Sequence, residues 1–170
     1  HQYGTPTIMY KPMKDSGFNA FALHARQRLN ATLVPTDANG VKALFKNLKQ
    51  GGFSVILPDH VPQPSGGVVV PFFGIPCLTS TLASKMAQKT QCRLVGLSCF
   101  RREDGEGFEV YCDDLNDPEL YDRDIEVATT ALNKAVEQMI NRFPAEYMWG
   151  YKRFRGIQSV NEDTFYKHGY

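Results

Sequence analysis

The spacing of apolar and polar residues predicts short buried strands that alternate with amphipathic helices in the first third of the chain. Compact apolar segments are typical of strands, and apolar residues that recur every three or four positions are typical of helices. The strands are expected at 5–10, 31–34 and 53–57, and the helices at 17–30 and about 38–50. The second helix carries three lysines opposite its apolar face and is expected to stop at Gly51.

The rest of the chain predicts more strands and a long amphipathic helix. The strands are expected at 68–70, 93–100 and 107–112, and the helices at 79–90 and 122–142. Asp104 and Gly105 form a turn signal that predicts an antiparallel hairpin, whereas the earlier alternation of strands and helices favours parallel pairing. We therefore expect an α/β fold with a mixed, mainly parallel sheet flanked by helices. One partial domain is expected over 1–155, followed by a peripheral C-terminal tail over 156–170.

The composition is that of a globular protein. The 170 residues are 42% hydrophobic and 22% charged, which excludes a disordered chain, a coiled coil and a collagen-like repeat. Nineteen Lys and Arg against 18 Asp and Glu give a net charge of +1, so a bulk field for nucleic acid is absent, although a local basic patch can survive inside this sum. No apolar run approaches the roughly 18–20 residues that a membrane-spanning helix needs.

The sequence carries no complete motif for a metal or a nucleotide. Neither a P-loop nor a dinucleotide fingerprint is present, and the histidines show no metal-ligand spacing. The cysteines contain no C-x-x-C pair, which argues against a zinc ribbon and a disulfide scaffold. Buried free thiols are expected instead at Cys77, Cys92, Cys99 and Cys112.

Polar residues follow two of the predicted strands. Asp59 and His60 come directly after 53–57, and Lys11 closes the first strand. Ligands bind at the carboxyl ends of parallel strands, so both positions are candidates for a ligand site. Lys11, with Lys14 three residues later, suggests that the ligand is an anion or a phosphate. Alternatively, Asp59 only caps the loop after it, and Lys11 is only solvated.

The segment 147–155 mixes aromatic rings with cations, including the only tryptophan, Trp149. Three interpretations fit this pattern: stacking on bases with contacts to phosphates, a position at a membrane interface, or a structural corner in which Trp149 and Phe154 fill the core. Periodicity does not decide among them.

Six stretches in order along the chain form a recognisable pattern. They are Tyr10-Lys11-Pro12, Arg26-Gln-Arg28-Leu-Asn30, the helix from Val41 to Gly51, Pro58-Asp59-His60, Val70-Pro-Phe-Phe-Gly74 with Pro76 and Thr79, and Pro144 with Tyr147-Met-Trp149 and Lys152-Arg153-Phe154-Arg155. In this set the chain resembles the lauroyl and myristoyl acyltransferases of bacterial lipid A biosynthesis, in the lysophospholipid-acyltransferase-like superfamily. The resemblance covers about 7–155 and implies a glycerolipid-acyltransferase-like fold.

The resemblance implies an enzyme at the cytoplasmic face of the bacterial inner membrane. It would move a fatty acyl chain from acyl carrier protein to a hydroxyl of a lipid A precursor, without a cofactor, a metal or nucleic acid. In that family the histidine of a His-x₄-Asp/Glu pair takes the hydroxyl proton, and the carboxylate orients the histidine. No histidine of this chain has Asp or Glu five positions later. The pair and a membrane anchor are therefore expected upstream of His1, and the chain is expected to be a soluble carboxyl-terminal portion, truncated and inactive alone.

The resemblance also suggests which residues contact the substrates. Lys11 replaces a usual arginine, and its ammonium is expected to hold phosphate less firmly than a planar guanidinium. Asp59 is expected to orient a cation, since an unpaired buried carboxylate is costly. Arg153 would anchor phosphate or the acidic carrier protein, and Phe72 and Phe73 would shape the acyl side. The full set is Lys11, Arg26, Arg28, Asp59, Phe72, Phe73, Thr79, Trp149 and Arg153.

Two other classes of function remain open. The aromatic and basic C-terminal segment would suit a non-catalytic module that binds an anionic lipid or an acidic partner. A hydrolase using Asp59 and His60 is a weaker alternative, because adjacent residues of a strand point to opposite faces.

Overall fold

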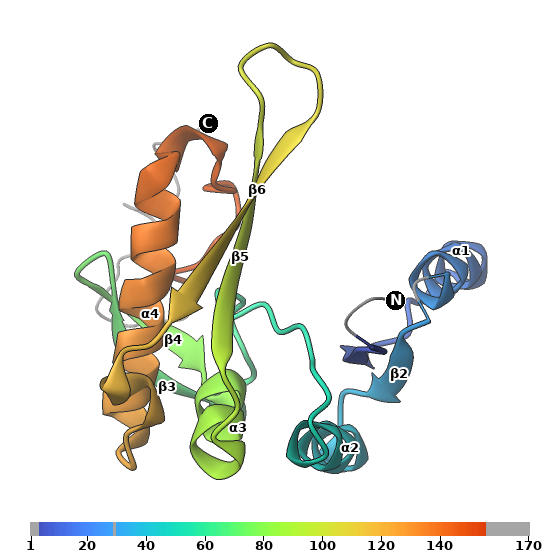
Figure 1. Ribbon diagram of the computed structural model, residues 1–170, viewed down its shortest axis with the longest axis horizontal. Helices are drawn as coiled ribbons and strands as arrows, with labels where there is room; N and C mark the ends of the chain where they lie inside the picture. Colours follow the sequence, from blue (N-terminus) through green and yellow to red (C-terminus); the bar gives the residue numbers. More distant parts are fainter. Residues whose placement is uncertain (1–3, 29, 156–170) are drawn as a thin grey trace. The chain divides into compact units, whose positions relative to one another are not determined.

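The chain divides into two compact units, unit 1 (His1–Ile56) and unit 2 (Leu57–Tyr170). The computed structural model describes residues 4–28 and 30–155 (Figure 1). The domain predicted over 1–155 therefore contains two units, and the tail predicted over 156–170 lies outside the described residues.

Unit 1 has the strand–helix–strand–helix order that its sequence predicts. Its elements are β1 (Thr7–Tyr10), α1 (Ser16–Gln27), β2 (Thr32–Pro35) and α2 (Ala38–Lys49). β1 and β2 pair in parallel, with Thr7 opposite Thr32, and α2 packs on both strands. Asp37 caps α2 by accepting hydrogen bonds from two backbone N–H groups of its first turn. α2 lies so close to β2 that a Cβ on Gly40 would fall 1.7 Å from the Pro35 carbonyl oxygen, so glycine is required there.

The strand predicted over 53–57 does not form. These residues belong to no ladder of the described chain, although the Thr7 N–H donates to the Phe53 carbonyl over 3.0 Å. The apolar composition of 53–57 predicted a buried strand. A buried strand also needs a neighbouring strand whose backbone pairs with its N–H and C=O groups. Phe53 and Val55 are exposed instead.

The first hairpin of unit 2 has one strand that the sequence predicts and one that it does not. β3 (Gly67–Phe72) pairs antiparallel with β4 (Ile75–Ser80), and the expected strand at 68–70 falls within β3. The two-residue turn between them has positive φ at both Phe73 (50°) and Gly74 (75°), as a type I′ turn requires. The helix expected from 79 starts later, as α3 (Leu82–Thr90), because β4 occupies the residues before it.

The remaining elements of unit 2 match their predictions closely. β5 (Leu94–Arg101) and β6 (Phe108–Leu115) form the expected antiparallel hairpin, and α4 (Ile125–Arg142) is the expected long helix. α4 packs against β3 and, less extensively, against β5. The other face of β5–β6 is exposed, and it presents Val95, Leu97, Phe108 and Val110 to solvent.

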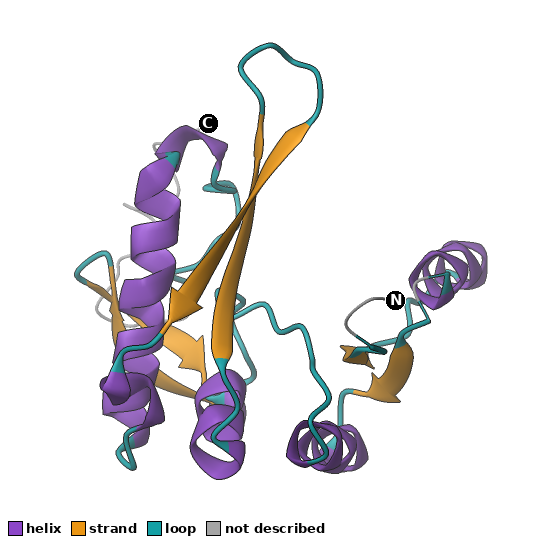
Figure 2. Ribbon diagram, in the orientation of Figure 1, coloured by secondary structure: helices purple, strands orange, loops and turns teal. Residues whose placement is uncertain are grey.

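The strands of the described residues form three separate two-stranded sheets: β1–β2 is parallel, and β3–β4 and β5–β6 are antiparallel. Figure 2 distinguishes the strands, in orange, from the helices, in purple. The mixed α/β class is confirmed. A mainly parallel sheet is not, because the long second half of the chain pairs through hairpins.

The prediction that all four cysteines are buried is wrong for two of them. Cys77 is fully buried and Cys92 half-buried, but Cys99 and Cys112 are exposed. Alternation along a strand places both on the outer face of β5–β6, the face that carries Leu97 and Val110.

Thiol labelling at pH 8 is expected to separate these cysteines. Cys99 and Cys112 should react in a fast phase, whereas Cys77 should react on the order of a hundredfold more slowly, because it needs local opening. Burial also raises the pKa of the Cys77 thiol and so lowers its thiolate fraction. The Cys99→Ser/Cys112→Ser variant should lose the fast phase. A Cys77 that labels at the fast rate without denaturant would contradict the burial described here.

Candidate functional site

The C-terminal segment returns from α4 across the β3–β4 hairpin. After α4, a short 3₁₀ turn (Pro144–Glu146) leads into residues 147–155. Phe154 is buried and joins Phe72, Cys77 and Ile140 in the hydrophobic core of unit 2. The structural-corner interpretation of this segment is therefore confirmed for Phe154, whereas Trp149 is 51% exposed.

Arg153 lies inside unit 2, with only 3% of its surface exposed. Its Nη1 donates to the Leu78 carbonyl and its Nη2 to the Thr79 hydroxyl, each over 2.7 Å. Its guanidinium carbon lies 5.3 Å from the centre of the Phe72 ring, within the range of a cation–π contact. Arg153 thus ties the C-terminal segment to β4.

Thr79 has its hydrogen-bonding capacity filled by protein groups. Its hydroxyl accepts from Arg153 and, over 3.1 Å, from the Asn133 side chain, and it donates to the Cys77 carbonyl over 3.4 Å. A hydroxyl has one donor and two acceptor sites, so all three are used. Asn133 also donates to the Pro71 carbonyl over 2.8 Å. This network joins α4, both strands of the hairpin and the C-terminal segment.

Three residues expected to contact substrate are therefore internal. Arg153, Thr79 and Phe72 are all buried. The expected anchoring of phosphate or carrier protein by Arg153 does not fit this placement, because both of its terminal nitrogens bond within unit 2. A motif of aromatic and basic residues looks the same in sequence whether its cations face solvent or neutral oxygens.

Asp59 is hydrogen-bonded by a residue 88 positions later in the chain. The Tyr147 hydroxyl donates to Asp59 Oδ2 over 2.9 Å. Burial, together with the neighbouring Asp59 carboxylate, raises the pKa of Tyr147 well above its ordinary value, so Tyr147 remains a donor at physiological pH. A carboxylate has about four lone-pair sites, and Tyr147 uses one. Asp59 is thus a half-buried carboxylate in a fixed position, which suits the orientation of a cation.

A second tyrosine fixes the residues after Asp59. The Tyr151 hydroxyl accepts from the Val61 N–H over 2.9 Å, and its ring lies 5.5 Å from the His60 ring. Asp59 and His60 therefore have different side-chain partners, and this arrangement does not form the pair that a hydrolase would need.

Aromatic side chains form a surface next to the Asp59–Tyr147 pair. The Trp149 ring lies 4.9 Å from that of Tyr147 and 5.7 Å from that of Phe73. Phe73 has a left-handed backbone, which is costly for a bulky residue, and its N–H donates to the Glu137 carboxylate over 2.7 Å. The bond and the ring contacts hold this turn, so that a carboxylate and an apolar surface occur together.

The predicted cations of the cleft belong to unit 1. Lys11 and Arg28 are exposed. Arg26 lies in α1, but its side chain is outside the part of the chain that the structure describes. The cleft that would join these cations to Asp59 stays a prediction.

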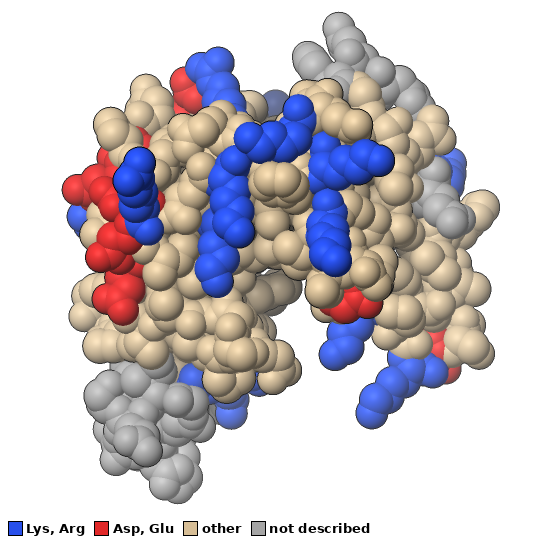
Figure 3. Space-filling view, turned by 90° about the horizontal axis from the view of Figure 1, so that it is seen from below, with Lys and Arg blue, Asp and Glu red and all other residues tan. Residues whose placement is uncertain are grey.

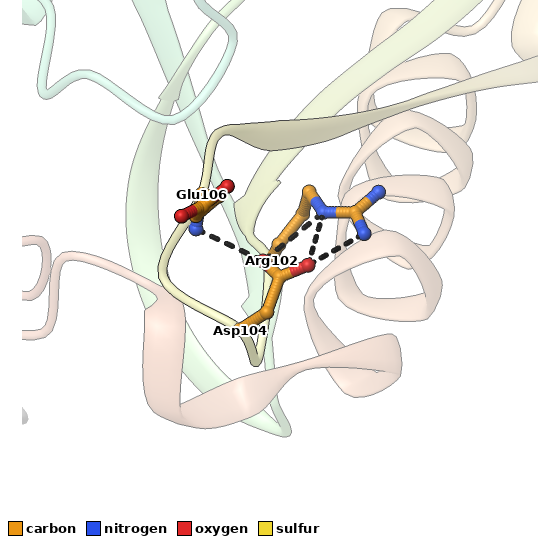
Figure 4. Close-up of polar contacts among 3 residues, drawn as sticks. All are labelled: Arg102, Asp104 and Glu106. Atoms are coloured by element: carbon orange, nitrogen blue, oxygen red, sulfur yellow. Dashed lines mark hydrogen bonds and ion pairs between the residues drawn. The ribbon is translucent and has the colours of Figure 1, made fainter.

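Two shallow clefts lie near the tip of the β5–β6 hairpin and the end of α4. The larger has a volume of about 640 Å³, and its walls include Phe100, Arg101 and Arg102. Figure 4 shows how Asp104 accepts from Arg102 and from the backbone N–H of Glu106. The bond from Arg102 lowers the pKa of the Asp104 carboxyl. Arg102 and Asp104 therefore compensate each other's charge at the hairpin tip.

Neither a spanning helix nor a metal cluster was found in the described part of the chain. Over residues 4–28 and 30–155, no helix combines the length and apolar character needed to cross a bilayer. The same residues contain no group of three or more His, Cys, Asp or Glu placed to hold a metal ion.

Comparison with known proteins identifies the family. Residues 1–156 match the family described as bacterial lipid A biosynthesis acyltransferase. The chain belongs to this family. The resemblance noted in the sequence motifs is thereby confirmed.

Curated relatives carry the same family description in their names. The chain is 29% identical over 150 residues to the lipid A biosynthesis lauroyltransferase of Escherichia coli K12, covering 86% of this chain and 47% of that protein. It is 23% identical over 158 residues to the lipid A biosynthesis palmitoleoyltransferase of the same strain, covering 92% and 50%. A lipid A biosynthesis acyltransferase of Haemophilus influenzae Rd is 26% identical over 151 residues, covering 86% and 47%. The chain therefore spans about half the length of these relatives.

Three residues of the site were absent from the predicted set. Tyr147 lies in the last of the six sequence stretches, but no role was predicted for it. Asn133 and Glu137 lie in the long helix predicted over 122–142. Asn133 carried a detectable signal, because it is a polar residue with an amide side chain beside Leu132 on the mostly apolar face of the helix. A buried amide must find partners, and Asn133 finds them in the β3–β4 hairpin, at Pro71 and Thr79.

Proposed function

We propose that this chain forms part of an acyltransferase that moves a fatty acyl chain from acyl carrier protein to a hydroxyl of a lipid A precursor. Membership of the lipid A biosynthesis acyltransferase family supports the reaction class. The relatives named lauroyltransferase and palmitoleoyltransferase support a fatty acyl group as the transferred unit. The proposed setting is the cytoplasmic face of the bacterial inner membrane.

The observation that carries this proposal on the structural side is the carboxylate of Asp59 beside an aromatic surface. Tyr147 fixes the carboxylate, and Trp149 and Phe73 supply apolar area next to it. In the proposed enzyme, Asp59 orients a cation that contacts the acceptor, and the aromatic surface lies along the acyl chain. Lys11, Arg26 and Arg28 supply positive charge for phosphates of the acceptor or for the acidic carrier.

The chain by itself is proposed to be inactive. Acyl transfer to a hydroxyl needs a base that removes the hydroxyl proton. No histidine among residues 1–170 is followed by Asp or Glu at the family's spacing. Asp59 is not proposed as this base, because the adjacent His60 ring contacts Tyr151 and the Asp59 carboxylate bonds to Tyr147, so the two do not form such a pair.

The test uses purified residues 1–170 with acyl carrier protein that bears a fatty acyl group and with a lipid A precursor as the acceptor. We expect measurable binding by calorimetry and no acylated lipid A precursor by mass spectrometry. Lys11→Ala and Arg28→Ala should each weaken binding by up to about fivefold, as expected for exposed ion pairs. Lys134→Ala, an exposed cation of α4, is the matched control and should leave binding unchanged.

Two results would overturn parts of this proposal. Acyl transfer by the chain alone would show that its base lies within residues 1–170. Absence of carrier binding would remove the proposed donor and favour a module that binds lipid only.

A further inference from the structure

The near-neutral net charge conceals two units of opposite charge. Residues 1–56 contain seven Lys and Arg against two Asp and no Glu, which gives unit 1 a net charge of +5. Residues 57–170 contain twelve Lys and Arg against sixteen Asp and Glu, which gives unit 2 a net charge of −4. Figure 3 shows lysine and arginine side chains that extend from the drawn face into solvent. Unit 1 is therefore the part of the chain suited to an anionic surface.

Helix α1 of unit 1 presents large apolar side chains to solvent. Phe18 is 60% exposed and Phe21 is 70% exposed, and their ring centres lie 6.2 Å apart. Met13, in the segment that leads into α1, is also exposed. Phe18 and Phe21 are three positions apart, so they share one side of the helix. Adjacent exposed aromatic rings with a neighbouring exposed methionine form the kind of contiguous apolar area from which interaction surfaces are built.

α1 is held at its beginning and leaves this side uncovered. Asn19 accepts hydrogen bonds from the Tyr10 hydroxyl and, over 2.9 Å, from the Met13 N–H. These bonds fix the segment after β1 against the first turn of α1. Within the described part of unit 1, α1 packs extensively on no other helix or strand. The rings therefore project from an anchored helix.

Cations flank these apolar side chains along the chain. Lys11 and Lys14 are exposed in the segment before α1, and Arg28 is exposed just after it. The one acidic residue between 4 and 28 is Asp15, whose carboxylate accepts from the Phe18 N–H over 2.7 Å. We call Lys11, Met13, Lys14, Phe18 and Phe21 the α1 patch. It combines apolar rings with unbalanced positive charge.

We propose that the α1 patch docks on an anionic lipid bilayer, with its rings in the headgroup region and its lysines on lipid phosphates. Helices that lie in a membrane interface combine an apolar side with cations in this way. Each cation near an anionic leaflet adds attraction, and lysine stems extend their charge toward the phosphates. A purely acidic protein partner would satisfy the lysines but not the rings.

The inference rests on the proposed function for its setting and adds the surface and its mode of contact. Lys11 is a proposed acceptor contact, and it lies directly before Met13 and Lys14 in the α1 patch. Docking by this patch would bring Lys11 to the depth at which the phosphates of a lipid acceptor lie.

The test measures co-flotation of purified residues 1–170 with vesicles of phosphatidylcholine, with and without phosphatidylglycerol. We expect binding only when phosphatidylglycerol is present. Phe18→Ser/Phe21→Ser should weaken it at least about tenfold, and Lys14→Gln by about fivefold, with a smaller dependence on salt. The substituted residues are exposed, and circular dichroism checks that the variants remain folded.

Matched controls come from unit 2. Phe108 is 63% exposed on the β5–β6 face and Lys85 is exposed on α3, so Phe108→Ser and Lys85→Gln should bind like the wild type. The proposal is wrong if the wild-type protein does not bind vesicles that contain phosphatidylglycerol. It is also wrong if Phe18→Ser/Phe21→Ser binds these vesicles as the wild type does, or if Phe108→Ser alone abolishes the binding. The α1 patch would instead be assigned to contact with a second copy of the chain under two conditions. The wild-type protein would sediment as a dimer without binding vesicles, and Phe18→Ser/Phe21→Ser would sediment as a monomer. Vesicle co-flotation tests the α1 patch, and carrier binding tests the proposed function. The two measurements are separate, so a failure of one proposal is distinguishable from a failure of the other.

Discussion

Replacing Arg153 with methionine is expected to lower the free energy of unfolding of unit 2 by about 3 to 6 kcal/mol, because two hydrogen bonds from a charged donor are lost at about 1.5–3 kcal/mol each. The Leu78 carbonyl would lose its bond from Arg153, and Thr79 would lose one of its two donors. Urea unfolding followed by the fluorescence of Trp149, the one tryptophan, measures this loss in unit 2.

Two further variants separate position from charge. Arg155→Met removes an exposed cation two residues away and should change stability by less than about 0.5 kcal/mol. Arg153→Lys keeps the charge but loses the planar fork, so it should fall between wild type and Arg153→Met. If Arg153→Met unfolds at the wild-type urea concentration, the guanidinium does not hold the segment in the way described.

Phe72→Ala is expected to cost about 3 to 5 kcal/mol, the range for removing a large aromatic side chain from a core. Phe72 is almost fully buried. Its ring lies 4.9 Å from that of Phe73 and 6.1 Å from that of Phe154. The same urea titration measures the loss, and Phe108→Ala on the exposed face of β6 is the control.

The outcome for Phe72 bears on its predicted role. A core role requires a large loss of stability for Phe72→Ala and a small one for Phe108→Ala. If Phe72→Ala were as stable as the control while acyl-carrier binding fell, the original prediction that Phe72 shapes the acyl side would regain support.

The elements that sequence predicted well are those fixed by local patterns. α2 follows from one apolar face, a capping aspartate at 37 and the glycine at 51, all within fifteen residues. The β5–β6 hairpin follows from the turn signal at 104–105. β4 was missed because the turn before it uses Phe73 with a positive φ, which aromatic residues rarely adopt.

The site was predictable as a set of positions and not as a set of roles. The motifs included Asp59, Tyr147, Thr79 and Arg153, and the structure pairs Asp59 with Tyr147 and Thr79 with Arg153. These pairs join residues 88 and 74 positions apart, so no local pattern reveals which side chains meet. Whether a cation faces solvent or a buried carbonyl depends on such long-range packing, which a single sequence does not display.

The position of Arg153 along the chain has a consequence for the order of folding. A β-hairpin closed by a type I′ turn forms in about 1–10 μs, so β3–β4 can assemble as soon as its residues leave the ribosome. Its partner Arg153 follows Leu78 by 75 residues, and synthesis adds about 5–20 residues each second. For several seconds of synthesis, the Leu78 carbonyl and the Thr79 hydroxyl of the nascent hairpin therefore lack the hydrogen bonds that Arg153 later donates. Unit 2 reaches its final packing only after translation passes residue 153, which makes chaperone protection most valuable during that interval.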